Sequence, residues 1–171
     1  VLVRHNSYLF KGTVEENLKM AKPDATKEEM EAVLQKVNLL GFLQTQDGLQ
    51  TQLLEKASNL SGGQCQRLVI ARALLRTDSA VYIFDEAASY IDVESEELIM
   101  NVIHELAKTK TVLLISHRLA NVVKSDKIYF LKDGEIKESG KHDELMSQNG
   151  AYRHLYESQM ALENYGKGGM A

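Results

Sequence analysis

The chain has 171 residues, of which 44% are hydrophobic and 26% are charged, as in an ordinary globular domain. Its net charge of −4, with acidic and basic residues interspersed, argues against a nucleic-acid-binding surface. Cys65 is the only cysteine, which excludes an internal disulfide and fits a reducing compartment. No apolar run approaches the roughly 18 residues that a membrane span needs.

Residues 1–10 predict the end of a core strand followed by a loop. Val1–Arg4 is strand-like and lacks an initiating Met, so we expect a piece of a longer protein. Residues 11–76 predict a mostly helical subdomain inserted between strands. Within this subdomain, Thr26 and Glu29 form a capping box that precedes apolar residues at helical spacing.

The segment Leu60–Gln64 predicts the start of a helix that can bind an anion. Ser61 is a suitable N-cap residue, and Gln64 three positions later completes a capping box. Gly62 and Gly63 leave the backbone N–H groups of the first turn uncovered, because glycine has no Cβ. These N–H groups and the positive end of the helix dipole suit a phosphate. The alternative is an ordinary helix cap with no ligand.

Residues 77–160 predict the C-terminal part of an α/β core. Val81–Phe84 is typical of a buried parallel strand, and Asp85 and Glu86 stand at its carboxyl end. Ligands of open α/β sheets bind at that end of the strands. Asp92 is placed to cap the next helix.

A second apolar strand, Thr111–Ile115, is followed by His117. Further along, Asp133-Gly134 separates two strand-like segments and predicts a hairpin. The region up to Met160 has a helical pattern, and residues 161–171 predict a flexible tail.

Taken together, these motifs resemble the nucleotide-binding domain of an ABC transporter of the exporter type. Leu60–Gln64 matches the LSGGQ signature, Val81–Glu86 the Walker B strand, Ser89–Asp92 the D-loop and His117 the switch histidine. The match extends from Val1 to about Tyr156. It implies an α/β fold of the P-loop NTPase (ABC ATPase) class, present here as a partial core with an inserted α-helical subdomain.

The resemblance implies ATP and Mg²⁺ as ligands and ATP hydrolysis as the activity. Such hydrolysis needs a metal near the phosphates, a group that activates water and charge stabilisation at the γ-phosphate. Asp85 would hold Mg²⁺ through water, Glu86 would be the general base and His117 would contact the γ-phosphate. A solvated acidic loop is the alternative reading of the carboxylate pair.

Two protein partners are also implied. Ser61, Gly62, Gly63 and Gln64 would contact the nucleotide held by a second nucleotide-binding domain in a head-to-tail dimer, with Asp92 at the seam. A transmembrane domain of the same transporter would precede this chain and contact residues 8–17. The resemblance therefore predicts a location at the cytoplasmic face of the cell membrane, and no nucleic-acid partner.

The sequence departs from the family pattern at several places, and two of these departures bear directly on nucleotide binding. His5 occupies the position of a glutamine that reaches Mg²⁺ and senses the γ-phosphate, and the histidine side chain is shorter than that of glutamine. None of the eleven glycines begins the phosphate-binding run G-x-x-x-x-G-K-[ST], known as Walker A. We therefore expect ATPase activity in the full transporter and an inactive isolated chain.

Two other functions are compatible with these residues. The first is a non-catalytic regulatory half-site in a heterodimeric transporter, which the histidine at position 5 favours. The second is a soluble ABC-type ATPase of DNA repair or chromosome organisation. That class has long coiled coils beside the signature, whereas this sequence has no sustained heptads.

Overall fold

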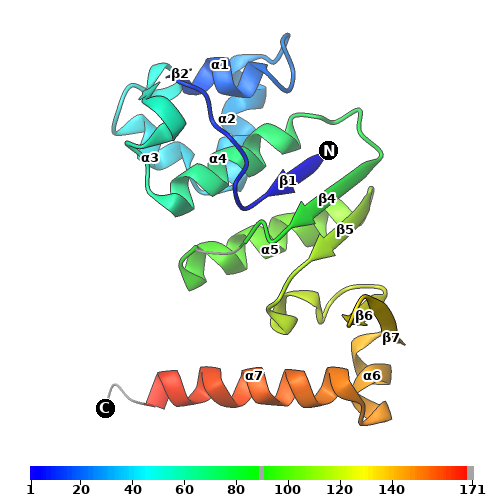
Figure 1. The fold of residues 1–171 in the computed structure, drawn as a ribbon. Coiled ribbons are helices and arrows are strands. Elements are labelled where there is room, and N and C mark those ends of the chain that lie inside the picture. Colours follow the sequence, from blue (N-terminus) through cyan, green and yellow to red (C-terminus); the bar gives the residue numbers. More distant parts are fainter. Residues whose placement is uncertain (89–90, 169–171) are drawn as a thin grey trace. The chain divides into compact units, whose positions relative to one another are not determined.

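The computed structural model describes residues 1–88 and 91–168. The chain forms two compact units, Val1–Ile115 and Ser116–Ala171, and Figure 1 shows the elements of each. The sequence-based division into parts 1–10, 11–76, 77–160 and 161–171 stays a prediction. The structure is mixed α/β with a parallel sheet, as the sequence predicts.

The first unit alternates helices with short strands. Its strands and α-helices are β1 (Leu2–Arg4), β2 (Gly12–Thr13), α1 (Val14–Lys19), α2 (Lys27–Lys36), α3 (Leu40–Gln44), β3 (Gln52–Leu53), α4 (Gly62–Leu74), β4 (Val81–Asp85), α5 (Val93–Ala107) and β5 (Thr111–Ile115). Strands β1, β4 and β5 form a parallel sheet in that order, with β4 in the centre. Since the strands are parallel, their carboxyl ends lie at one edge.

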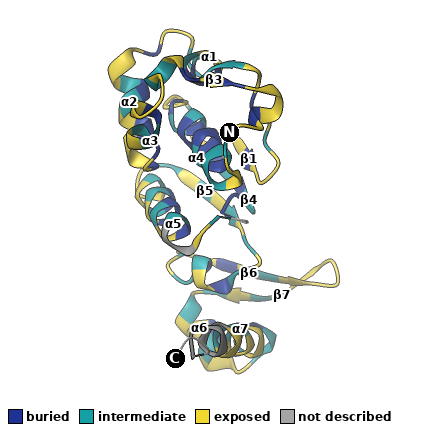
Figure 2. Ribbon diagram, turned by 90° about the vertical axis from the view of Figure 1, so that its left-hand side faces the viewer, coloured by how far each residue is buried: buried dark blue, intermediate teal, exposed yellow. Residues whose placement is uncertain are grey.

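Burial alternates from residue to residue along the strands of this sheet (Figure 2), so its two faces differ in burial. Val3, Tyr82 and Phe84 are buried in a core that they share with α4 and α5. The other face is largely open, with apolar side chains that are 44–49% exposed: Leu2, Val81, Leu113 and Ile115. The prediction that β4 is buried is therefore right for the face that carries Tyr82 and Phe84 and wrong for the face that carries Val81.

Capping boxes start three helices of the first unit. Thr13, Thr26 and Ser61 each accept a hydrogen bond from the backbone N–H three residues later. Thr26 and Ser61 were expected in this role, and α2 buries the apolar residues Met30, Val33 and Leu34 that recur at helical spacing. Helix α3 fits the prediction of a mostly helical subdomain, whereas the short antiparallel pair β2–β3 within it was not expected.

Asn17 on α1 is fully buried and holds the preceding loop in place. Its side-chain oxygen accepts from the Phe10 N–H at 2.8 Å. Its amide nitrogen donates to the carbonyl oxygens of Phe10 and Thr13 at 2.9 and 3.0 Å. One buried amide therefore bonds to three backbone groups and joins the loop to the start of α1.

We expect Asn17→Ala to lower the free energy of unfolding by about 2–4 kcal/mol, because three part-buried backbone groups lose their hydrogen bonds. Urea unfolding followed by circular dichroism measures the change. Asn101→Ala, at an exposed position of α5, is the matched control and should have little effect. Equal losses from both variants would contradict the assignment.

The second unit contains a hairpin and two helices. Its elements are β6 (Ile128–Lys132), β7 (Glu135–Gly140), α6 (His142–Gln148) and α7 (Ala151–Gly168), with a 3-10 helix at Leu119–Val122. The predicted hairpin is confirmed, and Asp133 and Gly134 both have the positive φ angles that its tight turn requires. Helix α7 extends past the expected end at Met160. Among the described residues, no helix combines the length and hydrophobicity that crossing a bilayer requires.

Candidate functional site

The candidate catalytic carboxylates lie where the central strand ends. Asp85 is the last residue of β4, and Glu86 follows with a φ angle of 50°. The Glu86 N–H donates to the Ile115 carbonyl oxygen at 2.9 Å, which ties this turn to β5. A left-handed φ is costly for a residue with a side chain and is found mostly where the surroundings impose it. The turn takes Glu86 out of the regular alternation of the strand.

The neighbouring strand brings a second pair of polar residues to the same edge. Arg4, the last residue of β1, is the direct sheet partner of Asp85. The Arg4 Nε atom lies 3.7 Å from an Asp85 carboxylate oxygen. His5 follows immediately, so the structure places three predicted site residues, His5, Asp85 and Glu86, at the ends of adjacent strands.

The signature segment forms the N-terminus of α4. The Ser61 hydroxyl oxygen accepts from the Gln64 N–H at 3.2 Å, and the Gln64 side-chain oxygen accepts from the Ser61 N–H at 2.9 Å. A Cβ added at Gly62 would meet no atom within 4 Å, so the space before the first turn is open. This geometry suits a phosphate at the helix N-terminus.

The second signature glycine packs against the end of the D-loop. A Cβ at Gly63 would come within 3.1 Å of the Ile91 side chain and 3.8 Å of an Asp92 oxygen. Asp92 caps α5, as expected, by accepting from the Ser95 N–H at 2.8 Å. That backbone hydrogen bond is the main cause that lowers the pKa of Asp92, and the charge of Arg67 adds to it. Ser89 and Tyr90 of the D-loop lie outside the described residues.

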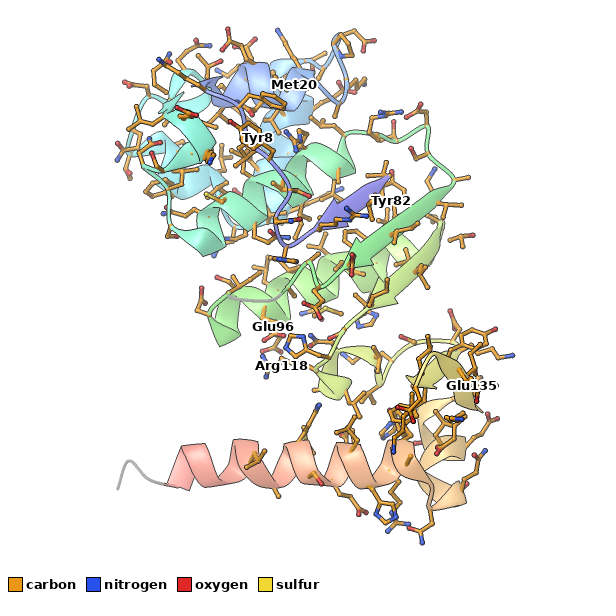
Figure 3. All side chains as sticks on the ribbon, viewed as in Figure 1. Tyr8, Met20, Tyr82, Glu96, Arg118 and Glu135 are labelled. Atoms are coloured by element: carbon orange, nitrogen blue, oxygen red, sulfur yellow. The ribbon has the colours of Figure 1, made fainter. Side chains whose placement is uncertain are left out.

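Two side chains on α4 bind the end of β1 and the segment that follows it, and the sequence analysis did not single them out. The buried Gln66 donates to the Arg4 carbonyl oxygen at 3.4 Å. Arg72 donates to the Tyr8 carbonyl oxygen at 2.9 Å, and its burial lowers the pKa of its guanidinium. Figure 3 labels Tyr8 on this segment. The helix that begins at the signature therefore also positions the loop that contains His5.

His117 belongs to the second unit and is held there through its backbone. The Gln159 side chain on α7 donates to the His117 carbonyl oxygen at 2.7 Å and accepts from the Leu119 N–H at 2.9 Å. This one glutamine fixes the segment that follows β5. The first unit thus contains His5, Asp85, Glu86, Asp92 and the signature, whereas His117 lies in the other unit.

The chemistry of these residues fits Mg²⁺ and a nucleotide. Mg²⁺ in phosphoryl-transfer sites is bound through one or two carboxylates together with substrate phosphates and water. The Asp85 side chain is 38% exposed and stands at a strand end, so it can offer one such carboxylate. The capped glycine turn at Ser61–Gly63 offers N–H donors for phosphate. When bound, the metal would neutralise charge on the phosphates.

Comparisons with known proteins agree with this geometry. An uncharacterized ABC transporter ATP-binding protein of Haemophilus influenzae is 52% identical over 162 residues, which cover 95% of this chain and 29% of the relative. An ATP-dependent lipid A-core flippase of Vibrio vulnificus is 42% identical, over 92% of this chain and 27% of the relative. A putative multidrug export ATP-binding/permease protein of Staphylococcus aureus is 41% identical with the same coverage.

A solved structure supports the fold. The structure of a bacterial Atm1-family ABC exporter with ATP bound matches with a TM-score of 0.84 and 30% identity, over 92% of this chain and 28% of that chain. The chain thus spans less than a third of the length of these proteins. The family described as ABC transporter matches residues 1–89, which is more than half of the sequence. The chain belongs to the ABC transporter family.

Proposed function

We propose that this chain is part of the ATP-binding and ATP-hydrolysing motor of an ABC exporter, which couples hydrolysis to transport across a membrane. The observation that carries the proposal is the edge of the parallel sheet. There, Asp85 and Glu86 end the central strand, in a chain that also presents a capped glycine turn at Ser61–Gly63. Relatives named as flippases and multidrug exporters support the exporter assignment.

In this proposal each site residue has a separate role in ATP hydrolysis. Asp85 would hold Mg²⁺, and Glu86 would accept a proton from the attacking water. His117 contacts the γ-phosphate and so stabilises its charge. His5, which follows the last residue of β1, would contribute a hydrogen-bond acceptor near the metal.

The remaining site residues act between two domains. Ser61, Gly62, Gly63 and Gln64 contact the nucleotide of a second nucleotide-binding domain in a head-to-tail dimer. Asp92 lies at the seam of that dimer. A Cβ at Gly63 would come within 3.1 Å of the Ile91 side chain, so the signature and the end of the D-loop lie side by side in this chain, which supports a shared role at the dimer seam.

A transmembrane domain is the other proposed partner. Tyr8 and Phe10 are 43% and 47% exposed, and their rings meet edge to face with centroids 4.8 Å apart. Exposed aromatic side chains that lie together mark protein-binding surfaces more often than isolated ones do. Binding there would place the chain at the cytoplasmic face of the membrane.

A non-catalytic half-site is the second candidate, and it is favoured by the histidine at position 5. Vanadate-sensitive ATPase activity of the full-length protein that contains this chain discriminates the two. We expect such activity, stimulated by Mg²⁺. Nucleotide binding without turnover in the intact protein would favour the regulatory half-site.

A further inference from the structure

Arg4 and Asp85 form an ion pair at the proposed metal site. They are register partners in adjacent parallel strands, so their side chains emerge on the same face of the sheet. The Arg4 Nε atom is 3.7 Å from the Asp85 Oδ2 atom. The partner of Asp85 on the other side is Ile115, which is apolar. Of its two sheet partners, Arg4 is therefore the one that supplies charge to this carboxylate.

The backbone of Arg4 is fixed at three points. Its N–H donates to the Ser7 hydroxyl oxygen at 2.9 Å. Its carbonyl oxygen accepts from the Ser7 N–H at 3.2 Å and from the Gln66 side-chain amide at 3.4 Å. These bonds hold the base of the arginine side chain while its guanidinium, on a side chain that is 57% exposed, can move. The arginine can therefore leave Asp85 and return to it.

A guanidinium and a metal ion compete for the same carboxylate. Arginine stays protonated in proteins, so its charge is present at any working pH. An exposed ion pair contributes little free energy, so a divalent cation with phosphates around it can displace the arginine. While the pair exists, however, each metal that binds Asp85 must first break it.

We propose that Arg4 is a positioning residue that neutralises Asp85 in the metal-free site and thereby weakens the binding of Mg²⁺-nucleotide. The inference rests on the proposed metal-holding role of Asp85. The effect on metal binding is assigned to the positive charge of the Arg4 side chain and not to the hydrogen bonds of the Arg4 backbone. A neutral side chain at this position should leave Asp85 available to the metal.

The test is calorimetric titration of the full-length protein with a non-hydrolysable ATP analogue, in Mg²⁺ and separately in EDTA. Arg4→Gln should raise the affinity for the Mg²⁺ complex about two- to fivefold, as expected for an exposed ion pair. The affinity in EDTA should not rise. Arg4→Lys keeps the positive charge, so its affinity for the Mg²⁺ complex should stay close to that of the unsubstituted protein. Arg76→Gln, which breaks another exposed arginine–aspartate pair with Asp78, is the matched control and should change neither affinity.

Asp85→Asn distinguishes a failure of the proposed metal role of Asp85 from a failure of the inference about Arg4. If Asp85 holds the metal, this variant weakens binding of the Mg²⁺ complex and leaves binding in EDTA unchanged. No effect of Asp85→Asn would overturn the metal role and the inference with it. A normal effect of Asp85→Asn, with no gain from Arg4→Gln, would overturn the inference alone. A loss of affinity in both conditions on Arg4→Gln would instead assign Arg4 to the phosphates and also overturn it.

Discussion

Glu86→Gln is expected to lower the ATPase turnover of the full-length protein by roughly 10²–10⁴-fold, the range for loss of a general base. Glutamine has nearly the same shape as glutamate but cannot accept a proton from water at neutral pH. The hydrogen bond from the Glu86 N–H to the Ile115 carbonyl oxygen involves only the backbone, so the left-handed turn should persist. Nucleotide binding should therefore remain, and the variant should accumulate a nucleotide-bound dimer.

Steady-state turnover and equilibrium binding of ATP, measured on the same preparation, check this prediction. Glu105→Gln is the matched control, because Glu105 is an exposed glutamate on α5 that pairs with Lys108. Its turnover should stay close to that of the unsubstituted protein. Unchanged turnover in Glu86→Gln would mean that a different group activates the water. A loss of nucleotide binding would mean that the substitution disturbs the site rather than the chemistry.

Local patterns in the sequence were sufficient to predict the capped helices, the hairpin and the parallel strands. Thr26 and Ser61 each form a capping box with a residue three positions later, so a few consecutive residues are sufficient to predict where these helices start. The turn at Asp133-Gly134 is equally local. The signature and Walker B motifs were recognisable because their residue types and spacing are specific.

Features that depend on distant parts of the chain could not be predicted in this way. An all-apolar run such as Val81–Phe84 does not reveal which face of a strand will be covered. The left-handed conformation of Glu86 accompanies its hydrogen bond to β5. The contact between Gly63 and Ile91, and the pair of Arg4 with Asp85, depend on packing and register between remote segments. Several of these features lie at the candidate site.

Ser61→Arg tests whether the signature acts across a dimer. The substitution removes the cap oxygen and puts a long side chain before the first turn of α4, so the N–H groups there should no longer reach a phosphate. We expect the damaged site to be the one whose P-loop belongs to the other subunit. A mixed dimer, with Ser61→Arg in one full-length chain and a disabled P-loop in its partner, should then retain one intact site. It should trap close to half as much nucleotide with vanadate as the unsubstituted dimer.

The reciprocal dimer supplies the control, because it carries both changes in one chain and an unsubstituted partner. If signature and P-loop meet across the interface, each change then damages a different site and trapping should fall almost to zero. If signature and P-loop act within one chain, the expected results are reversed. The reciprocal dimer then keeps one intact site, and the mixed dimer keeps none. Both dimers contain the same two substitutions, so a general loss of stability would lower trapping in both. Only the arrangement of the sites across the interface predicts that the mixed dimer retains trapping and the reciprocal dimer loses it.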